Sequence, residues 1–345
     1  MAQNHKHIER TKTVLVTGGA GFIGSHLTNR LLQNGYKVVV VDDLSGGFLE
    51  NIPSGATTIE GNVLDVPLLS NLFEKYKFNI IFHLAAYAAE GLSPFIRRFN
   101  YENNLIGSIN LINLSIKHKV ERFVFTSSIA VYGSNQVPMT ETLTPKPEDP
   151  YGIAKYSVEM DLRCARDVFG LPYTIFRPHN VYGEHQNIAD RYRNVIGIFF
   201  NQIMKDEPLT IFGDGEQKRA FSYIDDILAP MVDCITMPNT VGETFNLGAD
   251  QPYTINELAY AVMNVTDKKV PIRYLDARTE VVDAYADHEK TRKFFGNPSE
   301  LTQLEEGLSH MAKWVFTIGP RESAPFSDIE LTSGLPPSWQ SISLE

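Results

Sequence analysis

A tyrosine and a lysine at the start of a predicted helix have the types and the spacing of a proton-transferring pair. Tyr151 and Lys155 stand at positions i and i+4, so both side chains project from one face of that helix. Asp149 is typical of an N-cap and Pro150 of the first helical position. A tyrosine has an ordinary pKa of about 10, but a nearby ammonium group and the positive end of a helix both favour the phenolate. The pair could therefore act as a base near neutral pH.

Two adjacent serines could place a hydroxyl next to that base. Ser127 and Ser128 follow the apolar run 122–126, which predicts a strand, and a hydroxyl at its carboxyl end could hold a substrate oxygen beside the phenol. Simpler interpretations stay open from these residues alone. A lone YxxxK pattern is more often an ordinary surface pair, and either serine could merely end the strand.

Three glycines and one aspartate predict a dinucleotide site at the same sheet edge. Gly18, Gly21 and Gly24 lie in TGGAGFIG, between a predicted strand and a predicted helix. This spacing lets the backbone approach a pyrophosphate, whose charge the helix N-terminus favours. Asp42 follows Gly24 by eighteen residues and ends the next predicted strand, where a carboxylate can accept both ribose hydroxyls. A carboxylate would repel a 2′-phosphate, so the pattern predicts NAD rather than NADP.

The elements that must position these groups alternate along the chain. Short apolar runs predict strands at 13–17, 37–41, 57–59, 79–84, 122–126 and 173–176. Helical patterns lie around 66–75, 95–118 and 150–169. The alternation predicts an α/β fold with a doubly wound parallel sheet of the Rossmann type.

The pattern becomes shorter and less regular after about residue 180. We expect a flexible arm at 1–12, an NAD-binding Rossmann domain at 13–180 to which later segments return, and a smaller α/β carboxy-terminal region at 181–316 that mainly binds substrate. Residues 317–345 carry glycine, proline and serine without a helical period, which predicts an irregular tail.

Composition narrows the class of protein. The 345 residues are 43% hydrophobic and 21% charged, which is enough for a buried core. The formal net charge of −10 disfavours a nucleic-acid partner. The two cysteines have no metal-ligand spacing, so neither a metal site nor a disulfide framework is expected. No apolar run could span a membrane and the first residues are polar, which predicts a cytoplasmic protein without a membrane partner.

Seven ordered motifs between about residues 13 and 314 resemble the extended short-chain dehydrogenase/reductase superfamily. They are TGGAGFIGSHL, VVVVDDL, IIFHLAA, FVFTSSIAVYG, DPYGIAKYSVE, RPHNVYG and GDGEQKRAFSYIDD. Within that superfamily the sequence is similar to the NAD-dependent nucleotide-sugar epimerases of the UDP-glucose 4-epimerase type. The resemblance implies a nucleotide-sugar substrate, with a UDP-hexose favoured, and a homodimer that pairs two long helices.

The resemblance also assigns roles to particular positions. The implied catalytic residues are Ser128, Tyr151 and Lys155. The implied NAD-binding residues are Gly18, Gly21, Phe22, Ile23, Gly24, Asp42, Asn62, Val63, Leu84, Ala85, Ala86, Asn104, Tyr151 and Lys155. The implied substrate-binding residues are Ser128, Asn180, Asn194, Val195, Arg219, Arg278 and Glu280. Asp225 and Asp226 fit a family motif, and we expect them to be structural.

Two positions help to choose the reaction. The related 4,6-dehydratases carry Asp and Glu directly after the catalytic serine, where this chain has Ile129 and Ala130, which can transfer no proton. The remaining groups suffice for 4-epimerisation. The resemblance implies that Tyr151 takes the O4 proton while the C4 hydride passes to NAD, and that the 4-keto sugar rotates and is reduced on its opposite face. The alternatives are another nucleotide-sugar oxidoreductase such as a 4-ketosugar reductase, a uronic-acid 4-epimerase, or a non-catalytic NAD-sensing protein.

Several residues depart from the best-known epimerases. Asn62 replaces an aspartate that often contacts adenine, and Ala88 replaces a lysine that touches the cofactor in some members. His179 replaces an aromatic residue, and we expect ordinary packing for it and for His185. Ala284 stands where larger side chains narrow the sugar pocket, which predicts room for an N-acetyl group. A further apolar stripe, which suits either core or a dimer interface, comprises Leu105, Ile109, Ile112 and Ile116.

Overall fold

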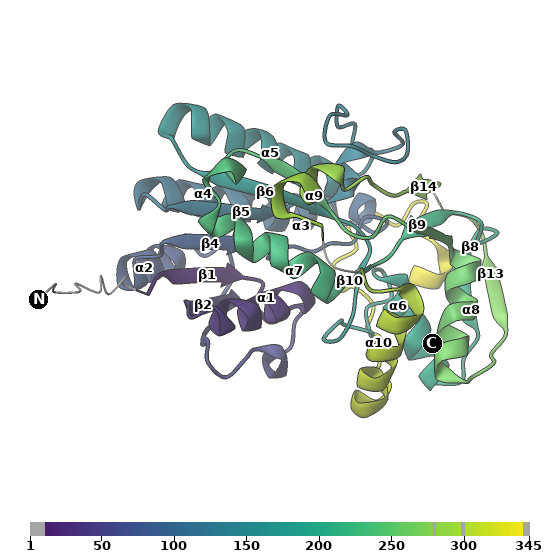
Figure 1. Cartoon of the computed structure of the whole chain (residues 1–345). Coiled ribbons are helices and arrows are strands. Elements are labelled where there is room, and N and C mark those ends of the chain that lie inside the picture. The colour runs from purple at the N-terminus through teal and green to yellow at the C-terminus, as the bar shows by residue number, and fades with distance from the viewer. Residues whose placement is uncertain (1–10, 279–280, 298–300, 341–345) are drawn as a thin grey trace, which may run out of the picture.

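A seven-stranded parallel sheet forms the centre of the computed structural model, which describes residues 11–278, 281–297 and 301–340 (Figure 1). Its strands lie in the order β11-β6-β5-β4-β1-β2-β3. The order reverses between β1 and β4, and ligands of such sheets bind at the carboxyl ends beside this switch point. The strand bounds are β1 Thr13–Thr17, β2 Lys37–Asp42, β3 Thr57–Glu60, β4 Ile80–His83, β5 Arg122–Thr126, β6 Tyr173–Pro178 and β11 Thr244–Leu247. The predicted doubly wound sheet is confirmed.

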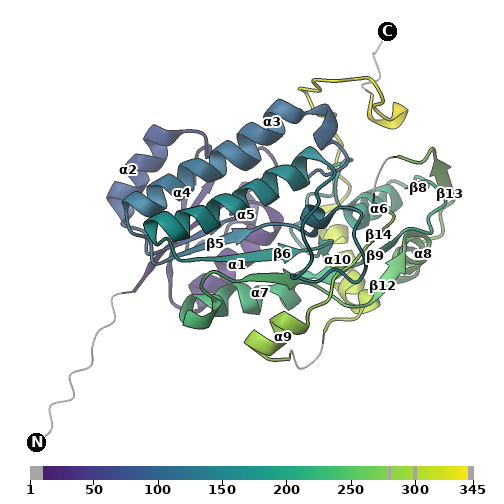
Figure 2. The same cartoon turned by 90° about the horizontal axis from the view of Figure 1, so that it is seen from above.

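Both faces of the sheet are covered, which explains why its central strands are continuous apolar runs. Neighbouring side chains on β1 point into different cores: Val14 and Val16 into one, Leu15 into the other. One face packs α1 (Phe22–Gln33), α7 (Ile224–Asp233) and α9 (Glu289–Phe295); the other packs α2 (Val66–Tyr76), α4 (Gly107–Lys117) and α5 (Pro150–Phe169) (Figure 2).

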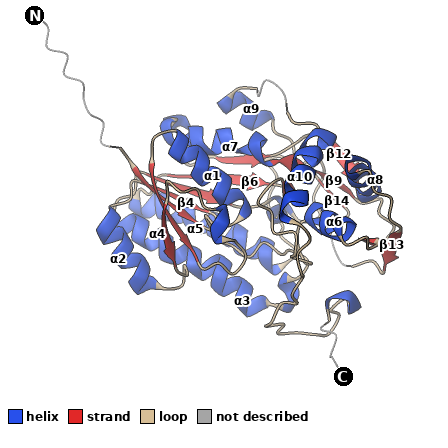
Figure 3. Cartoon of the chain, turned by 90° about the horizontal axis from the view of Figure 1, so that it is seen from below, coloured by secondary structure: helices blue, strands red, loops and turns tan. Residues whose placement is uncertain are grey.

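The second part of the chain consists of shorter elements beyond the carboxyl ends of the strands (Figure 3). Three helices, α6 (Val195–Met204), α8 (Ile255–Thr266) and α10 (Leu304–Ile318), extend the core that begins under α1 and α7. Small sheets join β7 (Val181–Tyr182) to β10 (Ser222–Tyr223), β8 (Leu209–Phe212) to β13 (Ile272–Leu275), and β9 (Lys218–Ala220) to both β12 (Pro252–Thr254) and β14 (Asp283–Ala284). The chain passes between the two parts more than once, because β11, α7 and α9 return to the large sheet.

The helix predicted at 95–118 is interrupted. A 3₁₀ turn at Ser93–Phe95 precedes α3 (Arg97–Tyr101), and a π-helical turn at Glu102–Ile106 joins α3 to α4. The apolar stripe predicted along this segment packs largely against the core below it, since Ile112 is fully buried and Leu105, Ile109 and Ile116 adjoin the same cluster. The stripe itself is therefore core rather than a free surface.

The predicted tail after α10 is irregular but packed. Apart from one 3₁₀ turn at Pro337–Trp339 it forms no regular element in residues 319–340, yet Leu335 and Trp339 are buried in a cluster with Leu92, Ile96 and Tyr192. The predicted amino-terminal arm lies mostly outside the described residues. Among the residues described, no helix is long and apolar enough to cross a membrane.

Candidate active site

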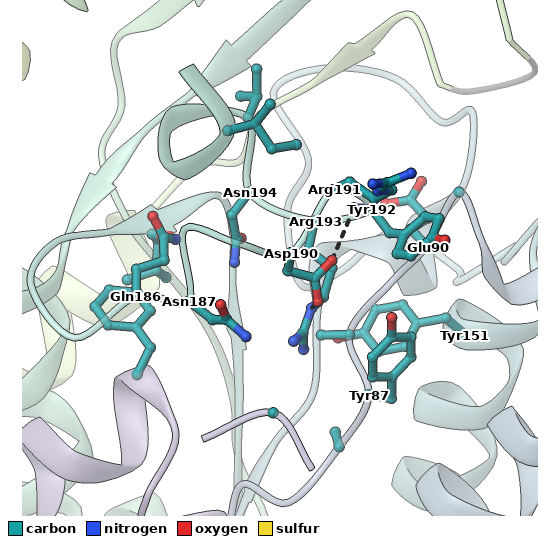
Figure 4. A pocket seen from close by; sticks show the side chains of 18 of the residues that line it. Tyr87, Glu90, Tyr151, Gln186, Asn187, Asp190, Arg191, Tyr192, Arg193 and Asn194 are labelled. Atoms are coloured by element: carbon teal, nitrogen blue, oxygen red, sulfur yellow. Dashed lines mark hydrogen bonds and ion pairs between the residues drawn. The ribbon is translucent and has the colours of Figure 1, made fainter. Parts of the chain in front are cut away.

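A cavity of about 1100 Å³ lies at the carboxyl ends of the sheet strands, between them and the small sheets (Figure 4). Most of the residues predicted for the cofactor and the substrate line this one space. They are Gly18, Gly21, Phe22, Ile23, Gly24, Asp42, Val63, Leu84, Ala85, Ala86, Ser128, Tyr151, Lys155, Asn180, Asn194, Val195, Arg219 and Arg278. Residues from all seven motifs therefore share one cavity.

The glycine-rich turn between β1 and α1 forms a cradle for an anion. Gly18 has a φ of +74°, and a Cβ there would lie 2.7 Å from the backbone nitrogen of Ala85. Gly21 is the N-cap of α1, no side chain caps the helix start, and no acidic residue lies in its first turn. The backbone N–H groups and the helix dipole therefore suit a pyrophosphate. These features fit the phosphate part of a dinucleotide.

The Asp42 carboxylate ends β2 and borders the cradle. One oxygen accepts a hydrogen bond from the backbone of Ala20 and the other from Leu44, both at 2.9 Å. Burial raises the pKa of Asp42, and these two backbone hydrogen bonds oppose that rise. The fixed carboxylate at this edge fits the predicted contact with ribose hydroxyls.

Two asparagines predicted to bind the cofactor do not line the cavity. The Asn62 amide donates to Asp43 at 2.7 Å and its oxygen accepts from the Leu64 N–H at 2.8 Å, so its hydrogen bonds are local. Asn104, in the π-helical turn, is buried and bonds both the N–H and the C=O of Tyr87. Asn104 thus shapes the loop after β4, and Glu280 lies outside the described residues.

Tyr151 and Lys155 occupy the first turns of α5, as predicted. Asp149 caps this helix by accepting a hydrogen bond from Gly152 N at 3.0 Å. Lys155 Nζ lies 5.8 Å from the centre of the Tyr151 ring and donates to the Thr126 carbonyl at 2.8 Å. Both side chains are buried and both border the cavity.

The electrostatics of the pair differ from the expectation. Burial raises the pKa of Tyr151 well above its ordinary value, although a hydrogen bond with Ser128 opposes this rise. Burial likewise lowers the pKa of Lys155 to about 7. The protein by itself therefore holds Tyr151 in its protonated form, because desolvation outweighs the nearby donors.

The two serines after β5 have separate partners. The Ser127 hydroxyl donates to Glu159 at 2.5 Å, and Glu159 forms a buried ion pair with Arg177. Ser128 lines the main cavity and also a side chamber of about 90 Å³, which Ala284 and His179 border. Both serines border the main cavity, but the Ser127 hydroxyl is held by Glu159, whereas Ser128 forms a hydrogen bond with Tyr151. Ser128 is therefore the better placed of the two candidates.

Charged and polar groups line the far end of the cavity. Asn180 has a φ of +41° and donates to Ala220 O at 3.1 Å, while Asn194 is the N-cap of α6, which Val195 begins. The Arg219 guanidinium donates to the carbonyls of Val281 and Val282. The Arg278 guanidinium lies over the Phe212 ring, 4.6 Å from its centre.

Part of the cavity lining was not predicted from the sequence. Between Gln186 and Asn194, every residue borders the cavity, and Arg193 lies 4.7 Å over the Tyr87 ring while donating to Asp190 (Figure 4). Glu90 and Trp339 also border it. The arginine-rich RYR before Asn194 was a usable signal for this segment, whereas nothing in the sequence marks Glu90 or Trp339.

The remaining predicted groups have packing roles. His179 is buried against Ala220 O and His288, and His185 contacts Ser25. Asp226 accepts two hydrogen bonds from Thr302. Within the described residues, no group of three or more His, Cys, Asp or Glu side chains could hold a metal ion.

A protein-family model described as the NAD dependent epimerase/dehydratase family matches residues 14–248. The chain belongs to this family. A putative UDP-glucose 4-epimerase of Methanocaldococcus jannaschii is 32% identical over 308 residues, which cover 88% of this chain and 98% of that protein. The family's cofactor is NAD, which the glycine cradle and Asp42 fit.

Solved structures show the same relationship for the whole fold. A UDP-glucose 4-epimerase of Thermotoga maritima, crystallised with UDP-glucose, matches with a TM-score of 0.84 and 36% identity, covering 89% of this chain and 99% of that one. A UDP-N-acetylglucosamine 4-epimerase of Methanobrevibacter ruminantium matches with a TM-score of 0.83 and 30% identity, covering 90% and 99%.

Proposed function

We propose that the protein interconverts the C4 epimers of a UDP-hexose, with UDP-glucose and UDP-galactose as the first candidates. The observation that carries the proposal is that one cavity is lined both by the glycine cradle and by Ser128, Tyr151 and Lys155. The names of the most similar relatives, several of them UDP-sugar 4-epimerases, support the same reaction.

Each catalytic group has a role that its position supports. Tyr151 accepts the proton of the sugar O4 as its phenolate and later returns it, while Ser128 bonds to the same oxygen. Burial raises the pKa of Tyr151, so this phenolate would depend on the positive charges of Lys155 and of the bound cofactor. Lys155 orients the ribose of the nicotinamide and contributes positive charge beside the phenol. NAD, when bound, supplies the hydride acceptor and the positive charge of its nicotinamide ring. Arg219 and Arg278 hold the diphosphate while the sugar turns over.

The surroundings of Ser128 favour epimerisation over elimination of water. Ile129 and Ala130 border the side chamber next to Ser128 and carry no group that can transfer a proton. Ala284 borders the same chamber with a small side chain. We infer that this chamber accepts an N-acetyl group at C2, so UDP-N-acetylgalactosamine is a second substrate to test.

The decisive experiment uses the wild-type protein and Tyr151→Phe. Incubation with UDP-galactose, UDP-N-acetylgalactosamine and UDP-glucuronic acid, followed by NMR of the C4 epimers, identifies the substrate class. We expect kcat of Tyr151→Phe to fall about 10³-fold, because the proton acceptor is lost, while bound NAD is retained. A wild-type protein that epimerises none of these sugars, or a variant with full activity, would refute the proposal.

The assembly and the compartment are part of the same proposal. We infer a homodimer formed by α4 and α5, because Ile106, Ile153 and Met160 near this helix pair are 48%, 39% and 54% exposed. Ile153 and Met160 are two helical turns apart on α5, so they share one face. We also infer a cytoplasmic enzyme, which the free and exposed Cys164 supports, since a reducing compartment preserves thiols.

A further inference from the structure

The carboxy-terminal segment 319–340, called here the C-terminal strap, lies across both parts of the molecule. Toward the large sheet, the Glu330 carboxylate accepts hydrogen bonds from the N–H groups of Arg98 and Phe99, both at 2.9 Å. Toward the small sheets, Arg321 and Asn201 exchange two hydrogen bonds. Figure 2 shows the strap in yellow beside the end of α3. The strap is therefore a fixed part of the fold.

The strap carries one large side chain to the wall of the cavity. Trp339 is 3% exposed and also borders the cavity, next to Arg278 and Phe212. Its ring centre lies 5.3 Å from that of Tyr192 and 5.9 Å from that of Phe212, both edge to face. Leu335 of the strap is buried in the same apolar cluster but does not border the cavity.

Arg278 lies in an aromatic cage that Trp339 completes. The centre of its guanidinium is 4.6 Å from the Phe212 ring and 5.4 Å from the Trp339 ring. Cations are attracted to aromatic faces, and an arginine held by two rings loses less rotational freedom when a ligand binds. A guanidinium that is fixed in advance can present its donors to a diphosphate at a lower entropic cost.

We propose that Trp339 is a positioning residue, which holds Arg278 ready for the diphosphate of the substrate. This inference rests on the proposed function, because it assumes a nucleoside diphosphate at this end of the cavity. The alignments cover 88% or 89% of this chain and 98% or 99% of two relatives. The last of the seven shared motifs, GDGEQKRAFSYIDD, ends at Asp226. The strap thus contributes to substrate binding from beyond the shared motifs.

The test compares point variants of the full-length protein, because removal of the whole strap would expose the apolar cluster beneath it. In Trp339→Ala we expect the Kd of UDP by calorimetry, and the KM of the UDP-sugar, to rise about tenfold. We expect kcat and bound NAD to stay within twofold, because Tyr151 and the glycine cradle do not contact Trp339. Trp339→Phe keeps an aromatic face and should stay within threefold of the wild type.

Two controls separate positioning from a merely structural role. Leu335→Ala removes a buried strap side chain away from the cavity and should change the Kd of UDP less than twofold. In an Arg278→Ala background, Trp339→Ala should have no further effect on that Kd. The inference is overturned if Trp339→Ala leaves UDP binding unchanged, if Leu335→Ala weakens it equally, or if the Trp339 and Arg278 effects are independent. A wild-type protein that binds NAD but not UDP would instead refute the proposed function itself.

Discussion

Glu159 connects the catalytic strand end to the core of the protein. It accepts hydrogen bonds from Ser127 and from Arg177, and Arg177 in turn donates to the Tyr132 hydroxyl at 2.7 Å. Glu159 and Arg177 are 0% and 2% exposed at their side chains. This network fixes the backbone next to Ser128, so it positions the site without facing the ligand.

Removing the charge of Glu159 should therefore be costly. In Glu159→Gln, Arg177 keeps its buried charge without its counter-ion, and we expect the free energy of unfolding to fall by about 3–5 kcal/mol. Urea denaturation measures the change. Glu74→Gln is the matched control, since Glu74 pairs with Lys77 at the exposed surface, where solvent screens the ion pair, and should change the free energy of unfolding far less. Equal losses of stability at the two positions would contradict the role of Glu159 as the buried counter-ion of Arg177.

Two buried histidines predict loss of stability in acid. Burial lowers the pKa of His83 and of His179 to about 3, whereas an unfolded histidine titrates near about 6.5. Between these values the unfolded chain binds more protons than the folded one, so stability falls as the pH falls below about 6.5. Each histidine lowers the free energy of unfolding by up to about 1.4 kcal/mol for each pH unit of acidification in this range.

Urea denaturation between pH 7.5 and 4.5 measures this dependence. We expect His83→Gln to reduce its slope by about one proton in the acid range, and the same change at the half-buried His310 serves as the comparison. An unchanged slope in His83→Gln would show that His83 is not the neutral buried group.

Sequence reasoning was most successful for residues whose role follows from local backbone geometry. Gly18, Asp149 and Tyr151 lie where their motifs place them, because strand ends and helix starts are set by neighbouring residues. Asn62 and Asn104 were predicted to bind the cofactor, but their actual partners, Asp43 and Tyr87, depend on loop conformations that a linear motif does not specify. Their roles toward the cofactor stay predictions, and the contacts described here are ones that the motifs did not specify.

The π-helical turn at Glu102–Ile106 helps to shape the site. It lies between α3 and α4 and contains Asn104, which holds the backbone of Tyr87 in the loop after β4. Such turns insert one residue into a helix and redirect the side chains that follow. Apolar periodicity predicted one continuous helix here, because the interruption is decided by tertiary contacts and leaves no local signal.

Asn104→Ala should expose the importance of this turn. The change removes the side-chain partner of the partly buried N–H and C=O of Tyr87, so we expect a loss of about 1–3 kcal/mol in the free energy of unfolding, with less bound NAD after purification. Asn113→Ala, at an exposed position of α4, should stay within about 0.5 kcal/mol. Normal stability and NAD content in Asn104→Ala would rule out this role.

At the scale of the whole molecule, the homodimer proposed on α4 and α5 can be tested directly. We expect the wild type to sediment as a dimer. Ile153→Asp combined with Met160→Asp should give folded monomers, because charges would be buried at the interface. Phe169, 65% exposed at the end of α5, offers a control position for a charged substitution. A wild type that sediments as a monomer would exclude the dimer.

The C-terminal strap shows where prediction from sequence reached its limit. Its composition correctly indicated an irregular segment, but packing of Trp339 and Leu335 on residues more than 100 positions away in the chain has no periodicity to reveal it. The central strands of the large sheet were easier to predict, because they are compact apolar runs, whereas the edge strand β11 was not predicted.

The return of β11 to the large sheet makes the intervening residues an insertion rather than a separable module. Strand β11 pairs with β6, although α6, β8 and β9 lie between the two strands in the sequence. If two related genes were recombined at a single point near residue 180, strand β11 would come from one parent and the rest of the large sheet from the other. Strands β8 and β9 also pair with β12, β13 and β14, which follow β11 in the chain. Chimeras that exchange sugar preference among relatives should therefore need four crossovers, on both sides of 181–223 and of 252–284, to keep each of these strand pairs within one parental sequence.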